Sequence, residues 1–228
     1  MLTLKLTQAA VAALLSLLVI ALCSAATPCH AQTRIIIARH GAVTYDYANP
    51  VIRNGQQDPS LTPDGQQQAA RLAELARAEG VTHIYHTPLT RGRETAEIVG
   101  RALKLQPVAV AAFAEIRLGD LEGKDLNQPP YKDQYAELLR EVEKKRTGGE
   151  SFAEMHARAT AALRDLIAKH PNQTILVVGH GVMNRTLVAM LRDISIKEAA
   201  AMQSQPNTRV YLVTWTGKPP ATVTQRDF

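Results

Sequence analysis

The stretch Ile35-Ile36-Ile37-Ala38-Arg39-His40-Gly41 decides the fold of this chain. Its first four residues form a short apolar run, which is typical of a β-strand buried on both faces. The stretch Thr174–Gly181 repeats this arrangement, because its apolar run ends in Gly179-His180-Gly181. Amphipathic helical patterns separate these and other short apolar runs. The alternation predicts an α/β fold, namely a three-layer α/β/α sandwich around a mainly parallel central sheet.

Capping and turn residues place the other elements. Thr62-Pro63 opens a helix that Gly80 ends, and Ser151 with Glu154 forms a capping box for a helix that runs to about Lys169. The irregular stretch 41–60 is longer than ordinary connections, which predicts a functional loop. We expect strands at 35–38, 81–86, 107–112, 174–178 and 208–216, and helices at 63–79, 90–103, 135–145, 151–169 and from about 182.

Polar side chains follow three of the expected strands. Arg39-His40 ends the first strand, the segment Thr87–Arg91 follows the second, and His180 follows the strand at 174–178. In open α/β sheets, ligands bind outside the carboxyl ends of the strands. A helix that begins just beyond His180 would point its free N–H groups and the positive end of its dipole at the same place. This edge is therefore the expected ligand site.

Residues 1–31 have the pattern of a secretory signal peptide. Lys5 is the only charged residue before Arg34, and Ala9–Leu22 is a nearly unbroken apolar run. The run is shorter than the roughly 20 residues that a membrane span needs. Small residues follow it, so cleavage is expected after Ala31 or Ala26, with an uncleaved membrane anchor as the alternative. Residues 32–228 are then one exported domain, periplasmic or secreted, without stable membrane insertion.

The cysteine content excludes several kinds of site. The two cysteines, Cys23 and Cys29, lie in or beside the targeting segment. Cleavage after Ala31 would leave a mature chain without cysteine nucleophiles, iron–sulfur clusters or thiolate zinc sites. His83 and His86 form an H-x-x-H pattern, but residues three apart on a strand face opposite sides. We therefore expect no metal site and no cofactor.

The charge pattern does not suggest a nucleic-acid partner. The chain has 26 basic and 21 acidic residues, a formal net charge of +5, without a dense basic run. The tightest cluster, Lys144-Lys145-Arg146, follows acidic Glu141 and Glu143 and is interpreted as a solvated helix face. A mildly basic surface suits anionic substrates.

Five segments, in order, resemble the motifs of the histidine phosphatase superfamily, the phosphoglycerate-mutase-like group, in its larger branch 1. The family patterns are RHG, LTxxGxxQA, SPLxRAxQTA, ExxxGxWEG and VxHGxxxR. The matching segments are Arg39–Gly41 (RHG), Leu61–Ala69 (LTPDGQQQA), Thr87–Ala96 (TPLTRGRETA), Glu115–Gly123 (EIRLGDLEG) and Val177–Arg185 (VVGHGVMNR). The resemblance covers nearly all of residues 34–215 and implies a phosphoglycerate-mutase-like fold.

The resemblance implies a role for each matching residue. His40 would be the nucleophile that forms a phosphohistidine, since imidazole is neutral and nucleophilic near pH 7. Glu115 would protonate the leaving oxygen and then activate the attacking water. Arg39 and Arg91 would bind phosphoryl oxygens with their forked donors. His180 would complete the anion pocket and help to stabilise the transferring group.

Two departures from the family pattern bear on substrate binding. Ala42-Val43-Thr44 follows RHG where the family often has a Glu-Thr or Glu-Ser pair and an Asn a few residues on. We expect Asn49 to take over the contact of that Asn with phosphate, with Asn54 as the alternative. Gly181 is expected to let substrate approach the backbone closely. His86-Thr87 stands where Ser is usual before Pro, which is expected to reshape the specificity rim.

The sequence supports three functional hypotheses. The leading one is an exported, metal-independent phosphomonoester hydrolase that acts through a phosphohistidine on a small phosphorylated substrate or a phosphoprotein. The first alternative is a phosphoglycerate-mutase-like phosphotransferase. The second is a catalytically inactive module that binds phosphorylated ligands. The sequence leaves the physiological substrate and the oligomeric state open.

Overall fold

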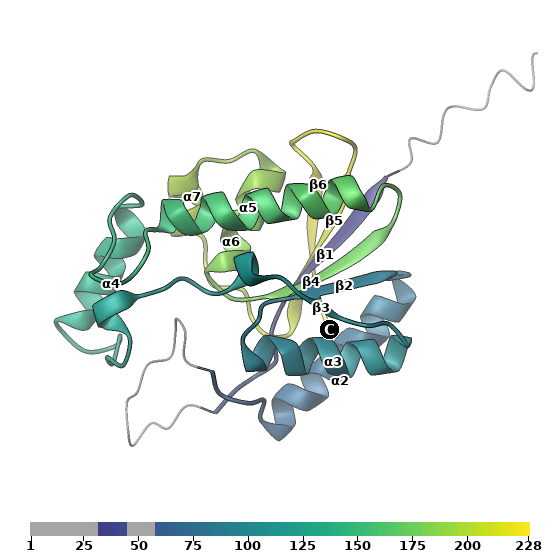
Figure 1. Ribbon diagram of the computed structural model, residues 1–228, viewed down its shortest axis with the longest axis horizontal. Coiled ribbons are helices and arrows are strands. Elements are labelled where there is room, and N and C mark those ends of the chain that lie inside the picture. Colours follow the sequence, from purple (N-terminus) through teal and green to yellow (C-terminus); the bar gives the residue numbers. More distant parts are fainter. Residues whose placement is uncertain (1–31, 45–57) are drawn as a thin grey trace, which may run out of the picture. The chain divides into compact units, whose positions relative to one another are not determined.

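The computed structural model describes residues 32–44 and 58–228, and a six-stranded sheet forms the centre of this part of the chain (Figure 1). The strands are β1 (Thr33–Arg39), β2 (His83–His86), β3 (Val108–Ala109), β4 (Thr174–Gly179), β5 (Arg209–Trp215) and β6 (Thr222–Asp227). Their spatial order is β3-β2-β4-β1-β5-β6. Neighbours from β3 to β1 pair in parallel, whereas β5 pairs antiparallel with both β1 and β6. The sheet is therefore mainly parallel with an antiparallel edge.

The pleat of β1 explains why helices cover both faces of the sheet. Ile35 and Ile37 belong to the core under α5 and α6, whereas Ile36 and Ala38 belong to the core under α2 and α3. Figure 1 shows α2 and α3 on one side of the sheet and α5, α6 and α7 on the other. The expected three-layer sandwich is confirmed. The helices are α2 (Pro63–Ala78), α3 (Thr90–Leu103), α4 (Tyr131–Arg140), α5 (Phe152–Lys169), α6 (Met183–Arg192) and α7 (Ile196–Ala201).

The helix starts follow the expected capping chemistry. The Thr62 side chain accepts a hydrogen bond from the Gly65 N–H, which caps α2. Ser151 and Glu154 form the reciprocal capping box at the start of α5. Both predictions are confirmed.

Four elements differ from the prediction. The strand expected at 107–112 is only Val108–Ala109, and Ala111–Phe113 forms a short 3-10 helix. Helix α4 begins at Tyr131 and ends at Arg140, so Lys144-Lys145-Arg146 lies beyond it and not on a helix face. Each of these cations pairs with a carboxylate, namely Glu137, Glu154 and Asp120, respectively. Strand β6 and helix α7 were not predicted. The first is an edge strand with mostly exposed side chains, and the second has only six residues, so neither carries a clear apolar period.

Residues 120–148, which include α4, are closed at their base by a narrow neck. A Cβ on Gly119 would lie 2.3 Å from the Thr147 carbonyl oxygen, and one on Gly149 would lie 2.7 Å from the Arg117 carbonyl oxygen. The Glu150 N–H donates to that same Arg117 oxygen at 2.9 Å. Glycine is required here because no side chain fits between the two backbones. The two ends of the segment thus lie side by side, while its side chains Leu121, Leu126, Leu138 and Val142 are buried in the core with residues of α5 and α6.

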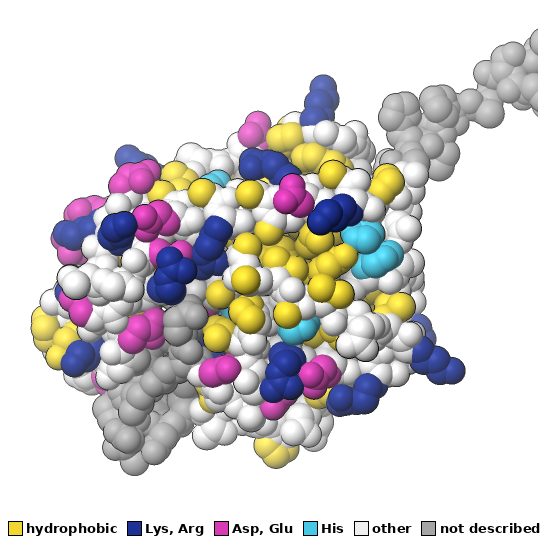
Figure 2. All heavy atoms as spheres, in the orientation of Figure 1, with side chains coloured by type: hydrophobic (Ala, Val, Ile, Leu, Met, Phe, Trp, Pro, Cys, Tyr) yellow, Lys and Arg dark blue, Asp and Glu magenta, His cyan; other side chains and the backbone are white. Residues whose placement is uncertain are grey.

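The face of the molecule shown in Figure 2 carries mixed charges and an apolar region. On the face shown in Figure 2, Lys and Arg side chains are interspersed with Asp and Glu, and hydrophobic side chains gather between α5 and α3. Val108 of edge strand β3 is 49% exposed. Within residues 32–44 and 58–228, no helix is both long and apolar enough to cross a membrane. The predicted signal peptide, residues 1–31, lies outside the described residues.

Candidate active site

His40 lies at the carboxyl end of β1 and has a defined hydrogen-bonding state. Its ring Nδ1 is 2.8 Å from the carbonyl oxygen of Gly41, and the side chain is only 3% exposed. A carbonyl can only accept, so Nδ1 carries the proton in the neutral ring. The Nε–H of Arg91 donates to the other ring nitrogen, Nε2, at 3.3 Å. Nε2 is therefore the unprotonated nitrogen, and its electron pair accepts a hydrogen bond from the guanidinium of Arg91.

His180 faces His40 from the end of β4. The two ring centroids are 5.2 Å apart, and the planes are tilted by 60°. Nε2 of His180 is hydrogen bonded to the hydroxyl of Thr87 at 2.8 Å. Nδ1 of His180 is buried and has no hydrogen-bond partner among the described residues. A buried polar atom of this kind suggests a ligand contact.

The surroundings keep both imidazoles neutral. The pKa of His40 lies well below its usual value, chiefly because the ring is buried and also because the charges of Arg39 and Arg91 are nearby. The hydrogen bond to Gly41 raises this pKa, but by less than the other causes lower it. Burial and the charge of Arg91 likewise hold the pKa of His180 well below its usual value. A neutral imidazole has the electron pair that a nucleophile needs.

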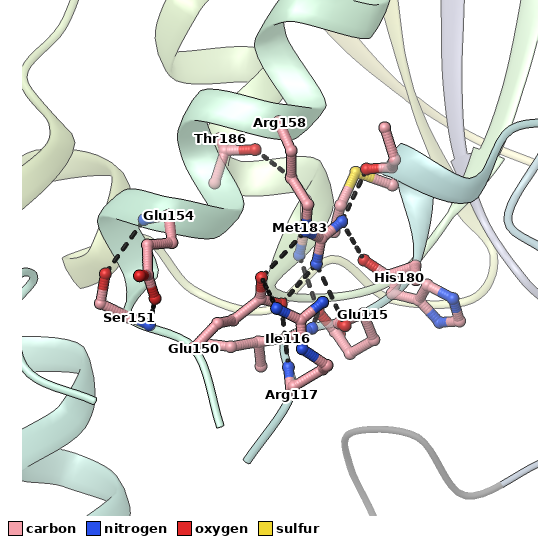
Figure 3. Close-up of polar contacts among 12 residues, drawn as sticks. Glu115, Ile116, Arg117, Glu150, Ser151, Glu154, Arg158, His180, Met183 and Thr186 are labelled. Carbon is pink, nitrogen blue, oxygen red and sulfur yellow. Dashed lines mark hydrogen bonds and ion pairs between the residues drawn. The ribbon is translucent and has the colours of Figure 1, made fainter. Parts of the chain in front are cut away.

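Glu115 is held at the N-terminus of α6. One carboxylate oxygen accepts the N–H of Met183 at 3.0 Å, and the other accepts the N–H of Val182 at 3.0 Å. The first oxygen also accepts the N–H of Ile116 at 3.0 Å. Because α6 begins directly after His180-Gly181, the same helix start positions both Glu115 and His180 (Figure 3).

Arg39 lies against the loop that carries His180. It donates from Nη1 to the carbonyl oxygen of Gln205 at 3.0 Å, and its Nε is buried without a hydrogen-bond partner in the described part of the chain. A Cβ on Gly181 would lie 2.5 Å from Ser204 Oγ and 3.6 Å from Arg39 Cζ. Gly181 therefore allows the 203–205 segment and the guanidinium to pack against this loop.

The RHG and LTPDG motifs interlock. A Cβ on Gly41 would lie 2.4 Å from the carbonyl oxygen of Gly65, and one on Gly65 would lie 2.1 Å from the carbonyl oxygen of Ala42. The N–H of Ala42 donates to the Gln68 side chain at 2.8 Å. The start of α2 is thereby fixed against the loop that follows His40.

Several buried polar residues that sequence reasoning missed support the end of β1. The Thr95 hydroxyl accepts the N–H of Gly41 at 3.0 Å and donates to the Arg91 carbonyl at 2.7 Å, which ties the nucleophile loop to α3. The Asn207 side chain donates to the His40 carbonyl. Two further amides reach the backbone of β1, since Asn184 donates to Ala38 and Gln205 donates to Ile37, each at 3.0 Å. Thr95 and Asn184 lie inside the segments that match the family motifs, and this position was the only feature of the sequence that could have pointed to them.

The remaining expectations have different outcomes. Arg91 and His180 lie beside His40, Arg39 lies against Gly181, and Glu115 is bound to the N–H of Val182, two residues beyond His180, while the roles expected for these residues stay predictions. Asn49 and Asn54 lie outside the described residues. His86 and Thr87 are buried, and the Thr87 hydroxyl is bonded to His180, so Thr87 lies beside the site, and its expected effect on specificity stays a prediction.

One further acidic side chain of the quoted motifs has a defined contact. Glu122 accepts the N–H of Leu118 at 2.9 Å, which is a structural contact within its own loop. Within residues 32–44 and 58–228, no group of three or more His, Cys, Asp or Glu side chains could hold a metal ion.

Comparisons with known proteins find relatives in sequence and in fold. The sequence profile of the histidine phosphatase superfamily (branch 1) matches residues 35–227. Phosphoglycerate mutase-like protein 4 of Arabidopsis thaliana is 30% identical over 181 residues, which cover 76% of this chain and 77% of that protein. A mycobacterial glucosyl-3-phosphoglycerate phosphatase has a TM-score of 0.72 at 22% identity, covering 84% of this chain and 97% of that chain. Phosphoserine phosphatase from Entamoeba histolytica, in complex with 3-phosphoglyceric acid, has a TM-score of 0.69 at 26% identity, covering 84% of this chain and 95% of that chain.

Proposed function

Since this chain belongs to branch 1 of the histidine phosphatase superfamily, we propose that it is a metal-independent phosphomonoester hydrolase with His40 as its nucleophile. One observation carries the proposal. His40 has its Nδ1 proton committed to Gly41, which leaves the Nε2 electron pair next to the Arg91 guanidinium. The His40 imidazole can attack phosphorus, and the Arg91 guanidinium can neutralise the charge of the phosphoryl oxygens.

The reaction proceeds in two transfers. In the first, His40 Nε2 forms a bond to phosphorus, the P–O bond to the alcohol breaks, and protonated Glu115 gives its proton to the leaving oxygen. In the second, Glu115 takes a proton from water as the water oxygen attacks phosphorus. The P–N bond then breaks and its electron pair returns to Nε2. Arg39, Arg91 and the buried Nδ1 of His180 stabilise the phosphoryl group in both steps.

The substrate class that we favour is a small phosphorylated molecule. The names of the matched proteins support this choice, since they include a glucosyl-3-phosphoglycerate phosphatase and a phosphoserine phosphatase. The cationic groups of the site provide recognition of the phosphate. A phosphoprotein remains the second substrate class for a screen.

The experiment that tests the proposal is capture of the phosphoenzyme. Rapid quenching with a ³²P-labelled phosphomonoester should give a protein-bound label that is stable in alkali and lost in acid. His40→Ala should abolish the label, and inorganic phosphate should be the final product. A label that persists in His40→Ala would identify a different nucleophile.

The phosphotransferase alternative has its own support in the 30% identity to a phosphoglycerate mutase-like protein. Adding a phosphoglycerate to the assay separates the two reactions. A mutase would move the label to a second hydroxyl of the phosphoglycerate, whereas the proposed hydrolase releases it as phosphate. A purified protein that neither takes up the label nor releases phosphate would favour the inactive binding module.

Export is part of the proposal. Its support is the order of Lys5, the apolar run and the small residues that precede Gln32. Mass spectrometry of the protein from its own cells should find a chain that begins near Thr27 or Gln32. A membrane-bound chain that begins at Met1 would contradict it.

A further inference from the structure

Arg158 and Glu150 lie behind the candidate acid and form a buried ion pair. Arg158 comes from α5, and Glu150 directly precedes the Ser151 cap of the same helix. The pair is joined by two hydrogen bonds, from Nε to Oε2 at 3.0 Å and from Nη2 to Oε1 at 2.6 Å (Figure 3). The Glu150 side chain is 1% exposed and that of Arg158 is 21% exposed. A fork-to-fork pair of this kind fixes orientation as well as charge.

The guanidinium of Arg158 also holds the backbone that leads to Glu115. Its Nη1 donates to the carbonyl oxygens of Ala112 and Ala114, at 2.6 and 2.9 Å. Its Nη2 donates to the carbonyl oxygen of Glu115 itself at 3.3 Å. With the two bonds to Glu150, all five N–H groups of the guanidinium have acceptors.

Glu150 holds the backbone on the other side of Glu115. Its Oε1 accepts the N–H of Arg117 at 3.0 Å, and the Arg117 side chain lies 3.3 Å from Oε2. The pair therefore binds the chain before, at and after Glu115. The carboxylate of Glu115 is in turn bound to the N–H groups of Val182 and Met183 at the start of α6.

We propose that Arg158 and Glu150 are positioning residues for the proton transfer by Glu115, and this inference rests on the proposed function of that residue. Neither side chain receives or gives the proton. They fix the backbone from which the Glu115 carboxyl extends, so the carboxyl stays aligned with the leaving oxygen. Misplacement of about 1 Å can cost roughly 10²-fold in rate. Arg158 also contributes to the low pKa of His180.

The main variant is Arg158→Lys, which keeps the charge but replaces five fixed donors by one mobile ammonium group. The measurement is the burst rate of phosphoenzyme formation with two substrates, an alkyl phosphate that the wild type hydrolyses and 4-nitrophenyl phosphate. The first needs a proton on its leaving oxygen and the second does not. We expect a loss of about 10-fold or more for the alkyl phosphate and of at most about 2-fold for the nitrophenyl ester. Arg164→Lys, an exposed change on the same helix, should alter neither rate.

The same substitution made in the Glu115→Gln variant separates a positioning role from general damage to the fold. In Glu115→Gln, the proton is already missing, so adding Arg158→Lys should not slow the alkyl burst further. Glu150→Gln should show the same substrate contrast and provides the test if Arg158→Lys does not fold. Equal losses for both substrates, or additive losses in the double variant, would overturn the inference. A wild type that forms no phosphohistidine would instead refute the proposed function.

Discussion

The side chain of Thr87 occupies the space that a Cβ on Gly92 would need. The Cγ2 atom of Thr87 lies 2.0 Å from the ideal position of that Cβ. Thr87 is fully buried, and its hydroxyl is bonded to His180, so the methyl group cannot turn away without breaking that contact. In the segment Thr87–Ala96, Thr87 stands where the family pattern has Ser and Gly92 stands where it has Ala, so these two differences meet at one packing contact.

This relationship predicts the behaviour of a variant pair. In Gly92→Ala, overpacking should lower the free energy of unfolding by about 1–3 kcal/mol. The higher helix propensity of Ala relative to Gly should offset roughly 1 kcal/mol of that loss. Thr87→Ser removes the methyl group and keeps the hydroxyl for His180. The double variant Thr87→Ser with Gly92→Ala should therefore be at least as stable as the wild type. Urea unfolding of all four proteins measures the coupling, and additive effects would contradict this reading of the contact.

The two buried histidines predict a pH dependence of stability. Their pKa values are lowered in the folded protein, chiefly by burial. Above pH of about 6.5 both states are neutral, and the histidines contribute no pH dependence. Below it the unfolded chain takes up protons that the folded chain does not, so the free energy of unfolding falls by up to about 1.4 kcal/mol per pH unit for each histidine.

Urea midpoints between pH 7.5 and 5.5 measure this effect. The decline below pH 6.5 should be smaller in His40→Asn and in His180→Asn than in the wild type, and the carboxylates common to all three proteins cancel in the comparison. An unchanged slope in both variants would show that the folded protein protonates these rings.

Glu115→Gln should slow phosphoenzyme formation, and the loss should be larger for substrates with poorer leaving groups. The amide keeps the shape of the side chain but has no proton to give. General-acid help is worth about 10²–10⁴-fold, so phosphoenzyme formation should fall steeply for an alkyl phosphate and much less for 4-nitrophenyl phosphate. Burst kinetics isolate this step, since the later attack of water also uses Glu115.

Equal burst losses for both substrates would show that Glu115 is not the donor. The nearby Asp120 is a poor replacement, because its bonds to Arg146 lower its pKa. Glu122, bonded to the Leu118 N–H, would be the next residue to test.

Inhibitors should distinguish this chemistry from metal-dependent hydrolysis. The proposed charge neutralisation comes from the guanidinium groups of Arg39 and Arg91, so EDTA should leave the rate unchanged. Vanadate should inhibit strongly, because it adopts the trigonal-bipyramidal geometry of the transferring phosphoryl group. Activity that EDTA removes and a divalent cation restores would refute the mechanism.

The sequence was informative where the relevant signal is local. An apolar run followed by His-Gly identifies the strand end and its reactive side chain together, which is why His40 and His180 could be predicted. Capping boxes are equally local, as at Ser151. Strand β6 was missed because an exposed edge strand such as Thr222–Asp227 has little apolar alternation to detect.

Supporting contacts were not predictable because they join distant parts of the chain. Asn207 binds the carbonyl of His40 across 167 residues, and Gln205 binds that of Ile37 across 168. An isolated Asn or Gln in a loop has no pattern that marks it as buried. The contact of Thr87 with His180 was not predictable for the same reason, since the two residues are 93 positions apart in the chain.

The narrow neck at Gly119 and Gly149 brings the two ends of residues 120–148 together, although the segment is not independent of the domain. Its side chains Leu121, Leu126, Leu138 and Val142 are buried in the core that also contains residues of α5 and α6. Glu115, in contrast, is bound by Arg158 of α5 and by N–H groups at the start of α6, outside the segment. A change in the length of residues 120–148 that kept both glycines and these four core side chains would therefore leave the bonds to Glu115 intact, so a lineage could vary this segment without rebuilding the support of that carboxylate.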